Sequence, residues 1–133
     1  MVNVNKSIAE IMTHCVISVP MEDSVEKIAE TMTVKCLSSV PVVNPAGEIF
    51  GVISLIDLER FRLTRQNAKS ARAWEICSMK PILADPRATV LEVAKRMLEH
   101  NVHHCVIAKN ESIEGIVSSM DFLREYVSIT EPA

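Results

Sequence analysis

The chain has 133 residues, of which 48% are hydrophobic and 4% aromatic, and its formal net charge is -3. This composition is typical of a globular domain, and the negative charge argues against a nucleic-acid partner, because phosphate backbones recruit an excess of lysine and arginine. No apolar run approaches the roughly 18 residues of a membrane-spanning helix, and the first residues lack the layout of a signal peptide, so we expect a cytoplasmic protein with no membrane partner.

The first half of the chain predicts a short helix, a short extended run, an amphipathic helix, two apolar strands around a turn, and a closing helix. The amphipathic helix begins after Ser24, a capping residue, because apolar side chains then recur at positions i, i+3, i+4 and i+7. The other expected bounds in this half are residues 8–12, 16–19, 40–43, 49–54 and 55–65.

The second half repeats this pattern. A shift of 65 residues, which becomes 64 after the turn between the two strands, superposes the halves and places Gly51 on Gly115. The second amphipathic helix begins after Thr89. The other expected bounds here are residues 73–77, 82–84, 105–108, 113–118 and 119–127. The order β-α-β-β-α therefore occurs twice, which predicts a mixed α/β (α+β) fold.

The two repeats span residues 7–62 and 71–127, and a polar, basic linker at residues 63–70 joins them. A unit of about 60 residues is marginally stable alone, because it buries a modest fraction of its surface. We therefore expect the repeats to pack their sheets together as one compact domain with pseudo-twofold symmetry and two related clefts.

Four cysteines occur along the chain, namely Cys15, Cys36, Cys77 and Cys105. None forms a C-x-x-C pair and each lies in an apolar stretch, so we expect reduced, buried thiols that act as small hydrophobic side chains.

A seven-residue motif occurs once in each repeat. It reads Gly-Val-Ile-Ser-Leu-Ile-Asp at residues 51–57 and Gly-Ile-Val-Ser-Ser-Met-Asp at residues 115–121. Together with the Val40-Pro41-Val42-Val43 strand, these motifs make each repeat resemble the CBS domain, and the chain a CBS pair, or Bateman module. The resemblance covers nearly the whole chain.

This resemblance implies a regulatory, ligand-sensing module that binds an adenosine nucleotide (AMP, ADP or ATP) in the cleft between the two repeats. We expect no further domain beside the two repeats, so the chain resembles stand-alone CBS proteins, which signal through a separate and here unknown protein partner. The resemblance also implies a homodimer. We expect no enzyme and no cofactor, because the sequence contains no G-x-S-x-G elbow, phosphate-binding loop or H-E-x-x-H motif.

The candidate ligand-binding residues centre on two serine–aspartate pairs, Ser54 with Asp57 and Ser118 with Asp121. Both pairs lie where a strand turns into a helix, where unpaired N–H groups attract phosphate. The carboxylate can accept hydrogen bonds from both hydroxyls of a ribose, and the serine hydroxyl can donate to a phosphate. The alternative is a plain helix cap, with the serine as N-cap residue; the two roles are compatible.

His103 and His104 stand where AMP-binding CBS domains carry a His-Arg pair that faces the phosphates. Histidine is a weaker and pH-dependent phosphate partner than arginine. The matching residues in repeat one are Ser38 and Ser39, which are uncharged. By family likeness the histidines would serve the cleft anchored by Asp57, which makes that site the better candidate.

Two further groups complete the predicted site. Ser18 matches a family Thr or Ser in the first strand and would face the same cleft, whereas its counterpart in repeat two is Leu83. Adenine would lie among the apolar side chains of Ile17, Leu37 and Val40.

Several alternatives stay open. A zinc site at the His-His-Cys run is disfavoured, because adjacent strand residues point to opposite faces, so we expect no metal. The basic stretch 60–72 is either a solvated surface or a rim for phosphate or an acidic partner. The ligand could be S-adenosylmethionine or a dinucleotide. A different class of function is a structural dimerisation module without obligatory ligand, in contact through an exposed apolar helix face that includes Leu58, Phe61, Phe122 and Tyr126.

Overall fold

The structure, a computed structural model, describes residues 5–14 and 16–131. It divides into two compact units. One comprises Ile17–Pro81 and is called the 17–81 unit; the other combines Met1–Val16 with Ile82–Ala133 and is called the 82–133 unit.

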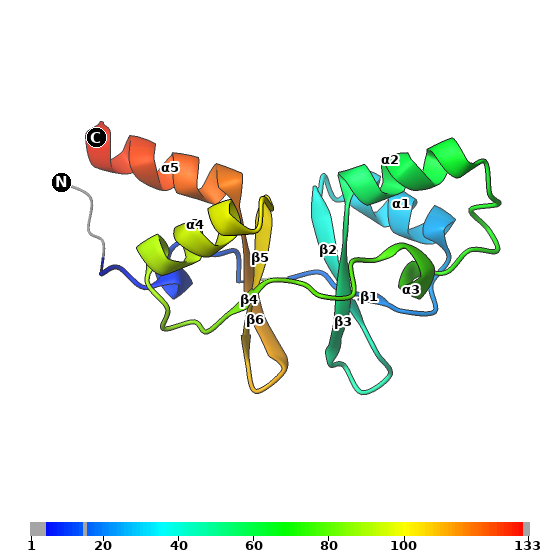
Figure 1. Cartoon of the computed structure of the whole chain (residues 1–133), viewed down its shortest axis with the longest axis horizontal. Coiled ribbons are helices and arrows are strands. Elements are labelled where there is room, and N and C mark those ends of the chain that lie inside the picture. The colour runs from blue at the N-terminus through cyan, green and yellow to red at the C-terminus, as the bar shows by residue number, and fades with distance from the viewer. Residues whose placement is uncertain (1–4, 15, 132–133) are drawn as a thin grey trace. The chain divides into compact units, whose positions relative to one another are not determined.

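The 17–81 unit contains one three-stranded mixed sheet in the order β1-β2-β3. Strand β1 pairs parallel with β2, and β2 pairs antiparallel with β3. The elements are β1 (Val19–Pro20), α1 (Val25–Val34), β2 (Ser39–Val43), β3 (Ile49–Ser54), α2 (Leu55–Thr64) and α3 (Ala73–Ile76). Helices α1 and α2 lie on the same face of the sheet (Figure 1).

The 82–133 unit repeats this topology. Strand β4 pairs parallel with β5, and β5 pairs antiparallel with β6. The elements are the 3-10 helix η1 (Ile8–Glu10), β4 (Leu83–Ala84), α4 (Val90–Glu99), β5 (His104–Lys109), β6 (Ser112–Ser118) and α5 (Ser119–Thr130). The mixed α/β fold predicted from the sequence is therefore confirmed.

The short helix that begins each sequence repeat packs in the unit formed mainly by the other repeat. Ile8 of η1 is fully buried in a core with Val93 of α4 and Val117 of β6. Ala73 of α3 is fully buried in a core with Ile28 of α1. Sequence comparison of the two halves gives no sign of this exchange, because the two short helices occupy equivalent positions in their repeats.

Backbone hydrogen bonds fix the exchanged segments. In the 82–133 unit, the N–H of Thr13 donates to the carbonyl of Ile116 at 2.9 Å, and Lys6 forms an ion pair with Glu125 of α5 at 2.7 Å. In the 17–81 unit, the N–H of Ser78 donates to the carbonyl of Val52 at 2.9 Å. Each segment thus runs beside the last strand of the sheet, β6 or β3.

Capping and turn chemistry set the remaining element bounds. The predicted caps are confirmed, because the side chains of Ser24 and Thr89 accept hydrogen bonds from the N–H groups of the third helical residues. The change of register between the repeats lies at the strand connections. In the turn between β2 and β3, Gly47 has a φ of +83°. In the tighter turn between β5 and β6, Asn110 and Glu111 both have positive φ.

The prediction that every cysteine is buried is wrong for Cys36. Its side chain is exposed because the residue follows the end of α1 in a left-handed conformation, with φ +54°. Cys105 is buried, and burial raises the pKa of its thiol to about 11. Cys77 is half-buried, and Cys15 lies outside the described residues.

Candidate functional site

The two candidate turns are the strand-to-helix junctions of the two units. The 54–57 turn joins β3 to α2, and the 118–121 turn joins β6 to α5. Ser54 and Ser118 are the N-cap residues and both have extended backbones, so the chain leaves each strand and enters the helix without a loop. The unpaired N–H groups of the first helical turn give this edge partial positive charge.

In the 54–57 turn the carboxylate caps its own helix through one oxygen. Oδ2 of Asp57 accepts hydrogen bonds from the backbone N–H of Ser54 at 2.8 Å and from the Ser54 hydroxyl at 2.9 Å. The N–H of Asp57 donates back to Oγ of Ser54 at 3.4 Å. Among the described residues, no group donates to Oδ1 of Asp57. The helix-cap interpretation is therefore correct for one oxygen, and the other is available to a ligand.

In the 118–121 turn the carboxylate again caps its own helix, but the Ser118 side chain makes no cap hydrogen bond of its own and the second carboxylate oxygen is engaged. Oδ2 of Asp121 accepts from the N–H of Ser118 at 2.8 Å and from its hydroxyl at 3.2 Å. Oδ1 accepts from Nη1 of Arg124 at 3.1 Å, and this ion pair lies within the first turns of α5.

The glycine of each motif faces the chain's own backbone. A Cβ on Gly115 would lie 2.8 Å from the carbonyl oxygen of Thr13, and one on Gly51 would lie 2.8 Å from Sγ of Cys77 and closer still to the carbonyl oxygen of Ser78. The motif glycines therefore allow the exchanged segments to run beside β6 and β3.

The histidine pair lies beside the 118–121 turn. The N–H of Ser119 donates to the carbonyl of His103 at 3.0 Å, Nδ1 of His103 is 3.3 Å from the Ser119 hydroxyl, and His104 pairs with Ser118 across the sheet. His103 is exposed and His104 is half-buried. Burial, followed by the neighbouring His103, lowers the pKa of His104, which favours the neutral imidazole.

The equivalent places beside the 54–57 turn carry serines, as the sequence alignment of the repeats predicted. The N–H of Leu55 donates to the carbonyl of Ser38 at 3.1 Å, and Ser39 pairs with Ser54 across the sheet. Ser38 is exposed and Ser39 is buried.

The other predicted residues of the 17–81 unit differ in how accessible they are. Ser18 is exposed just before β1, and Ile17 is also exposed. Leu37 is half-buried against the core, whereas Val40 is fully buried within it. A base that binds in this unit as described can therefore reach Ile17 but not Val40.

The structure brings the nine predicted site residues together in two groups. Five belong to the 17–81 unit, namely Ser18, Leu37, Ser38, Ser54 and Asp57, and four belong to the 82–133 unit, namely His103, His104, Ser118 and Asp121. Over the described residues, no group of three or more histidine, cysteine or acidic side chains forms a possible metal site. Within the same part of the chain, no helix has the length and apolar character needed to span a membrane.

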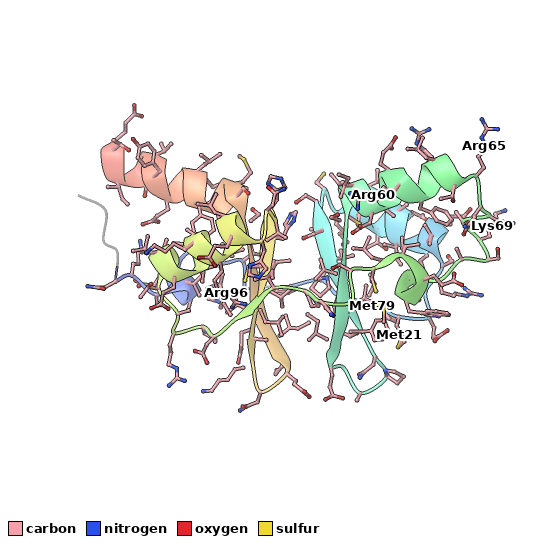
Figure 2. The ribbon with its side chains drawn as sticks, viewed as in Figure 1. Met21, Arg60, Arg65, Lys69, Met79 and Arg96 are labelled. Atoms are coloured by element: carbon pink, nitrogen blue, oxygen red, sulfur yellow. The ribbon has the colours of Figure 1, made fainter. Side chains whose placement is uncertain are left out.

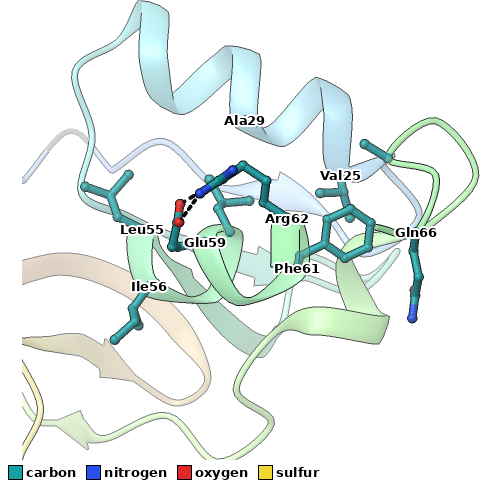
Figure 3. A pocket seen from close by; sticks show the side chains of 10 residues that line it. Val25, Ala29, Leu55, Ile56, Glu59, Phe61, Arg62 and Gln66 are labelled. Atoms are coloured by element: carbon teal, nitrogen blue, oxygen red, sulfur yellow. Dashed lines mark hydrogen bonds and ion pairs between the residues drawn. The ribbon is translucent and has the colours of Figure 1, made fainter. Parts of the chain in front are cut away.

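A groove lies between α1 and α2, and sequence reasoning did not predict it. Its volume is about 680 Å³. Leu55, Ile56 and Phe61 line it from α2, Val25 and Ala29 line it from α1, and a Glu59–Arg62 ion pair crosses its polar side (Figure 3). Leu58 and Phe61 were expected on an exposed apolar helix face, but Phe61 is buried and Leu58 is half-buried, because both pack against the core while they line this groove.

The basic stretch forms a charged border at the end of α2. Figure 2 shows Arg60 on α2, Arg65 at its carboxyl end and Lys69 in the following loop. All three residues are exposed.

Comparison with protein-family models identifies the repeats. The model of the CBS domain matches residues 8–63 and again 73–128. The chain belongs to the CBS-domain family. It carries two CBS domains, and such pairs are regulatory modules that generally bind adenosine ligands.

Relatives and solved structures agree with this assignment. Arabinose 5-phosphate isomerase KpsF of Escherichia coli is 25% identical over 115 residues, which are 86% of this chain but 35% of that protein. A putative signal-transduction protein with CBS domains from Burkholderia ambifaria is 21% identical, has a TM-score of 0.85, and matches over 96% of this chain and 97% of that one. A hexameric CBS-CP12 protein from bloom-forming cyanobacteria is 20% identical with a TM-score of 0.83, over 96% and 75% of the two chains.

The chain thus spans about a third of the length of the isomerase that it matches. Because the identity to the solved structures is low, their similarity supports the fold alone.

Proposed function

We propose that this CBS-domain pair is a regulatory module that binds an adenosine nucleotide (AMP, ADP or ATP), with the ribose hydroxyls on the carboxylate of Asp57 or Asp121. The observation that supports this most strongly is the free Oδ1 of Asp57. One oxygen of this carboxylate caps the helix at 2.8 Å, which fixes its orientation, and no described residue donates to the other. A preoriented acceptor binds a hydroxyl with little loss of side-chain entropy.

The phosphate-binding part of the proposal rests on charge and on hydrogen-bond donors. The amino-terminal ends of α2 and α5 supply positive partial charge, and two histidines lie beside the 118–121 turn. The predicted location of the ligand in a cleft between the two repeats stays a prediction. Signalling to a protein partner would follow if the ligand favours one conformation of the module over another.

Equilibrium dialysis tests the proposal, with adenosine, AMP, ADP, ATP and S-adenosylmethionine offered separately to the full chain. We expect saturable binding of at least one adenine nucleotide, and at least a tenfold loss of affinity in Asp57→Asn or in Asp121→Asn. Asp85→Asn is the matched control, because Asp85 is also an arginine-paired turn carboxylate but lies outside both serine–aspartate turns. If none of the five compounds shows saturable binding, the proposal is refuted. If only S-adenosylmethionine binds, the ligand is S-adenosylmethionine and not an adenine nucleotide.

Self-association is a second proposed role, and the groove between α1 and α2 favours it. Ile56 is 58% exposed and Leu55 is 55% exposed in this groove, and such apolar side chains lose contact with water when a partner covers them. The hexameric CBS-CP12 protein shows that a related module assembles. We propose a homodimer through this groove, which is compatible with nucleotide binding.

A further inference from the structure

The two serine–aspartate turns share a cap made by the aspartate, but they differ at the second carboxylate oxygen. In both turns Oδ2 accepts the N–H of the capping serine at 2.8 Å. Oδ1 of Asp121 also accepts from Arg124 at 3.1 Å, whereas no described residue donates to Oδ1 of Asp57. The Asp121 side chain is 12% exposed in this ion pair.

The difference does not arise from a missing arginine. Arg60 occupies the position in α2 that Arg124 occupies in α5, three residues after the aspartate. Arg60 lies on α2 (Figure 2) and is exposed, and within the described residues it forms no ion pair. The ion pair of α2 instead joins Glu59 to Arg62, and the residues equivalent to these two in α5 are Leu123 and Tyr126.

A ribose offers two adjacent hydroxyl donors, and a carboxylate binds such a pair best when both of its oxygens can accept. At Asp121 one oxygen caps the helix and the other is paired, so a ribose competes with Arg124. At Asp57 the competing group is absent from the described residues. We propose that the Arg124–Asp121 ion pair weakens nucleotide binding at the 118–121 turn, so that the 54–57 turn fills first.

This inference rests on the proposed function and adds an order of filling and a residue that sets it. The size of the effect follows from exposure. The Arg124 side chain is 69% exposed, and exposed ion pairs contribute little in water, so its removal changes affinity by about two- to fivefold. The effect also falls as salt concentration rises, because mobile ions screen the pair.

Isothermal titration of the full chain with AMP, and separately with adenosine, tests the proposal. We expect two classes of site, of which Asp57→Asn removes the tighter and Asp121→Asn the weaker. Arg124→Gln tightens the weaker class by about two- to fivefold at low salt and by less at 1 M salt. Arg60→Gln is the matched comparison, and with adenosine, which carries no phosphate, it leaves both classes unchanged.

The outcomes separate this inference from the function on which it rests. Loss of the tighter class in Asp121→Asn, or two equal classes in the unmodified protein, would overturn the order of filling. Unchanged or weaker adenosine binding in Arg124→Gln would overturn the role of Arg124. Weaker AMP binding beside tighter adenosine binding would show that Arg124 also contacts the phosphate, and it would keep the competition at the ribose. No binding of either compound would overturn the order of filling, whereas the proposed function itself is refuted only if ADP, ATP and S-adenosylmethionine also fail to bind.

Discussion

Gly51 and Gly115 connect the signature motif to the exchange of segments between the repeats. Each lies on the last strand of its sheet, where the exchanged segment runs alongside through paired backbone hydrogen bonds. A Cβ at Gly51 meets the carbonyl oxygen of Ser78, and one at Gly115 meets the carbonyl oxygen of Thr13 as well as the Met12 side chain. The backbone atoms cannot move aside as a flexible side chain does. Sequence reasoning identified both glycines as part of the repeated motif but did not identify the approaching segment.

We expect Gly51→Ala and Gly115→Ala each to lower the free energy of unfolding by about 1–3 kcal/mol, because a methyl group is forced against packed backbone. Chemical denaturation monitored by circular dichroism measures this. Gly47→Asn is the control, since nothing lies within 4 Å of a Cβ there and asparagine tolerates its φ of +83°. An equal or larger loss in the control would contradict the packing explanation.

His104 makes stability depend on pH near neutrality. Its pKa in the folded protein is lowered below 6.5, chiefly by burial. The unfolded chain therefore binds a proton at a higher pH than the folded protein does. Above pH 6.5 the imidazole of His104 is neutral in both the folded and the unfolded protein. Below that pH the unfolded chain takes up a proton before the folded protein does, which favours unfolding.

We expect the free energy of unfolding to fall as pH decreases from about 6.5 towards the lowered pKa, and His104→Gln to reduce that slope. Urea denaturation at a series of pH values between 5 and 8 measures it. His100→Gln serves as the control, because His100 is exposed at the end of α4. A slope that is the same in His104→Gln and in the unmodified protein would contradict this assignment.

At the scale of elements, each unit completes its core with a short helix from the other repeat. Ile8 is fully buried among α4, β5 and β6 residues, although it begins the repeat that contains α1. The exchange ties the folding of each unit to a segment that is distant in the sequence.

We expect Ile8→Ala to cost about 2–5 kcal/mol and to reduce amide protection in α4, β5 and β6 more than in α1, β2 and β3. Native-state hydrogen exchange resolves the two sets of amides. Ile28→Ala is the matched variant, because Ile28 is fully buried in the core of the 17–81 unit and should produce the reverse pattern. Greater loss of protection in α1, β2 and β3 for Ile8→Ala would contradict the exchange.

The helices, strands and caps were predictable because each has a local signal. Ser24 and Thr89 cap helices with regular apolar spacing, and the strand 49–54 was predicted with its observed bounds. The exchange was not predictable, because the lead-in helices of the two repeats are short and equivalent and carry no partner-specific pattern. The Arg124–Asp121 pair was also missed, since the same spacing at Arg60 and Asp57 produces no such pair.

At the scale of the whole molecule, a partner chain is expected to cover the groove between α1 and α2. We expect Ile56→Glu to shift a homodimer towards monomer, because a buried, unpaired carboxylate is costly at an apolar interface. Sedimentation equilibrium measures the association constant. Met79→Glu is the control, because Met79 is also 63% exposed but lies outside the helices. Dissociation by both variants, or by neither, would argue against this groove as the contact.

The proposed regulatory function depends on a nucleotide that binds through the serine–aspartate turns. A crystal structure of the protein, from crystals grown in the presence of AMP, tests this most directly. We expect the two ribose hydroxyls to lie within hydrogen-bond distance of the Asp57 carboxylate while Oδ2 still caps α2. AMP bound elsewhere, with Oδ1 of Asp57 facing only water, would contradict the account.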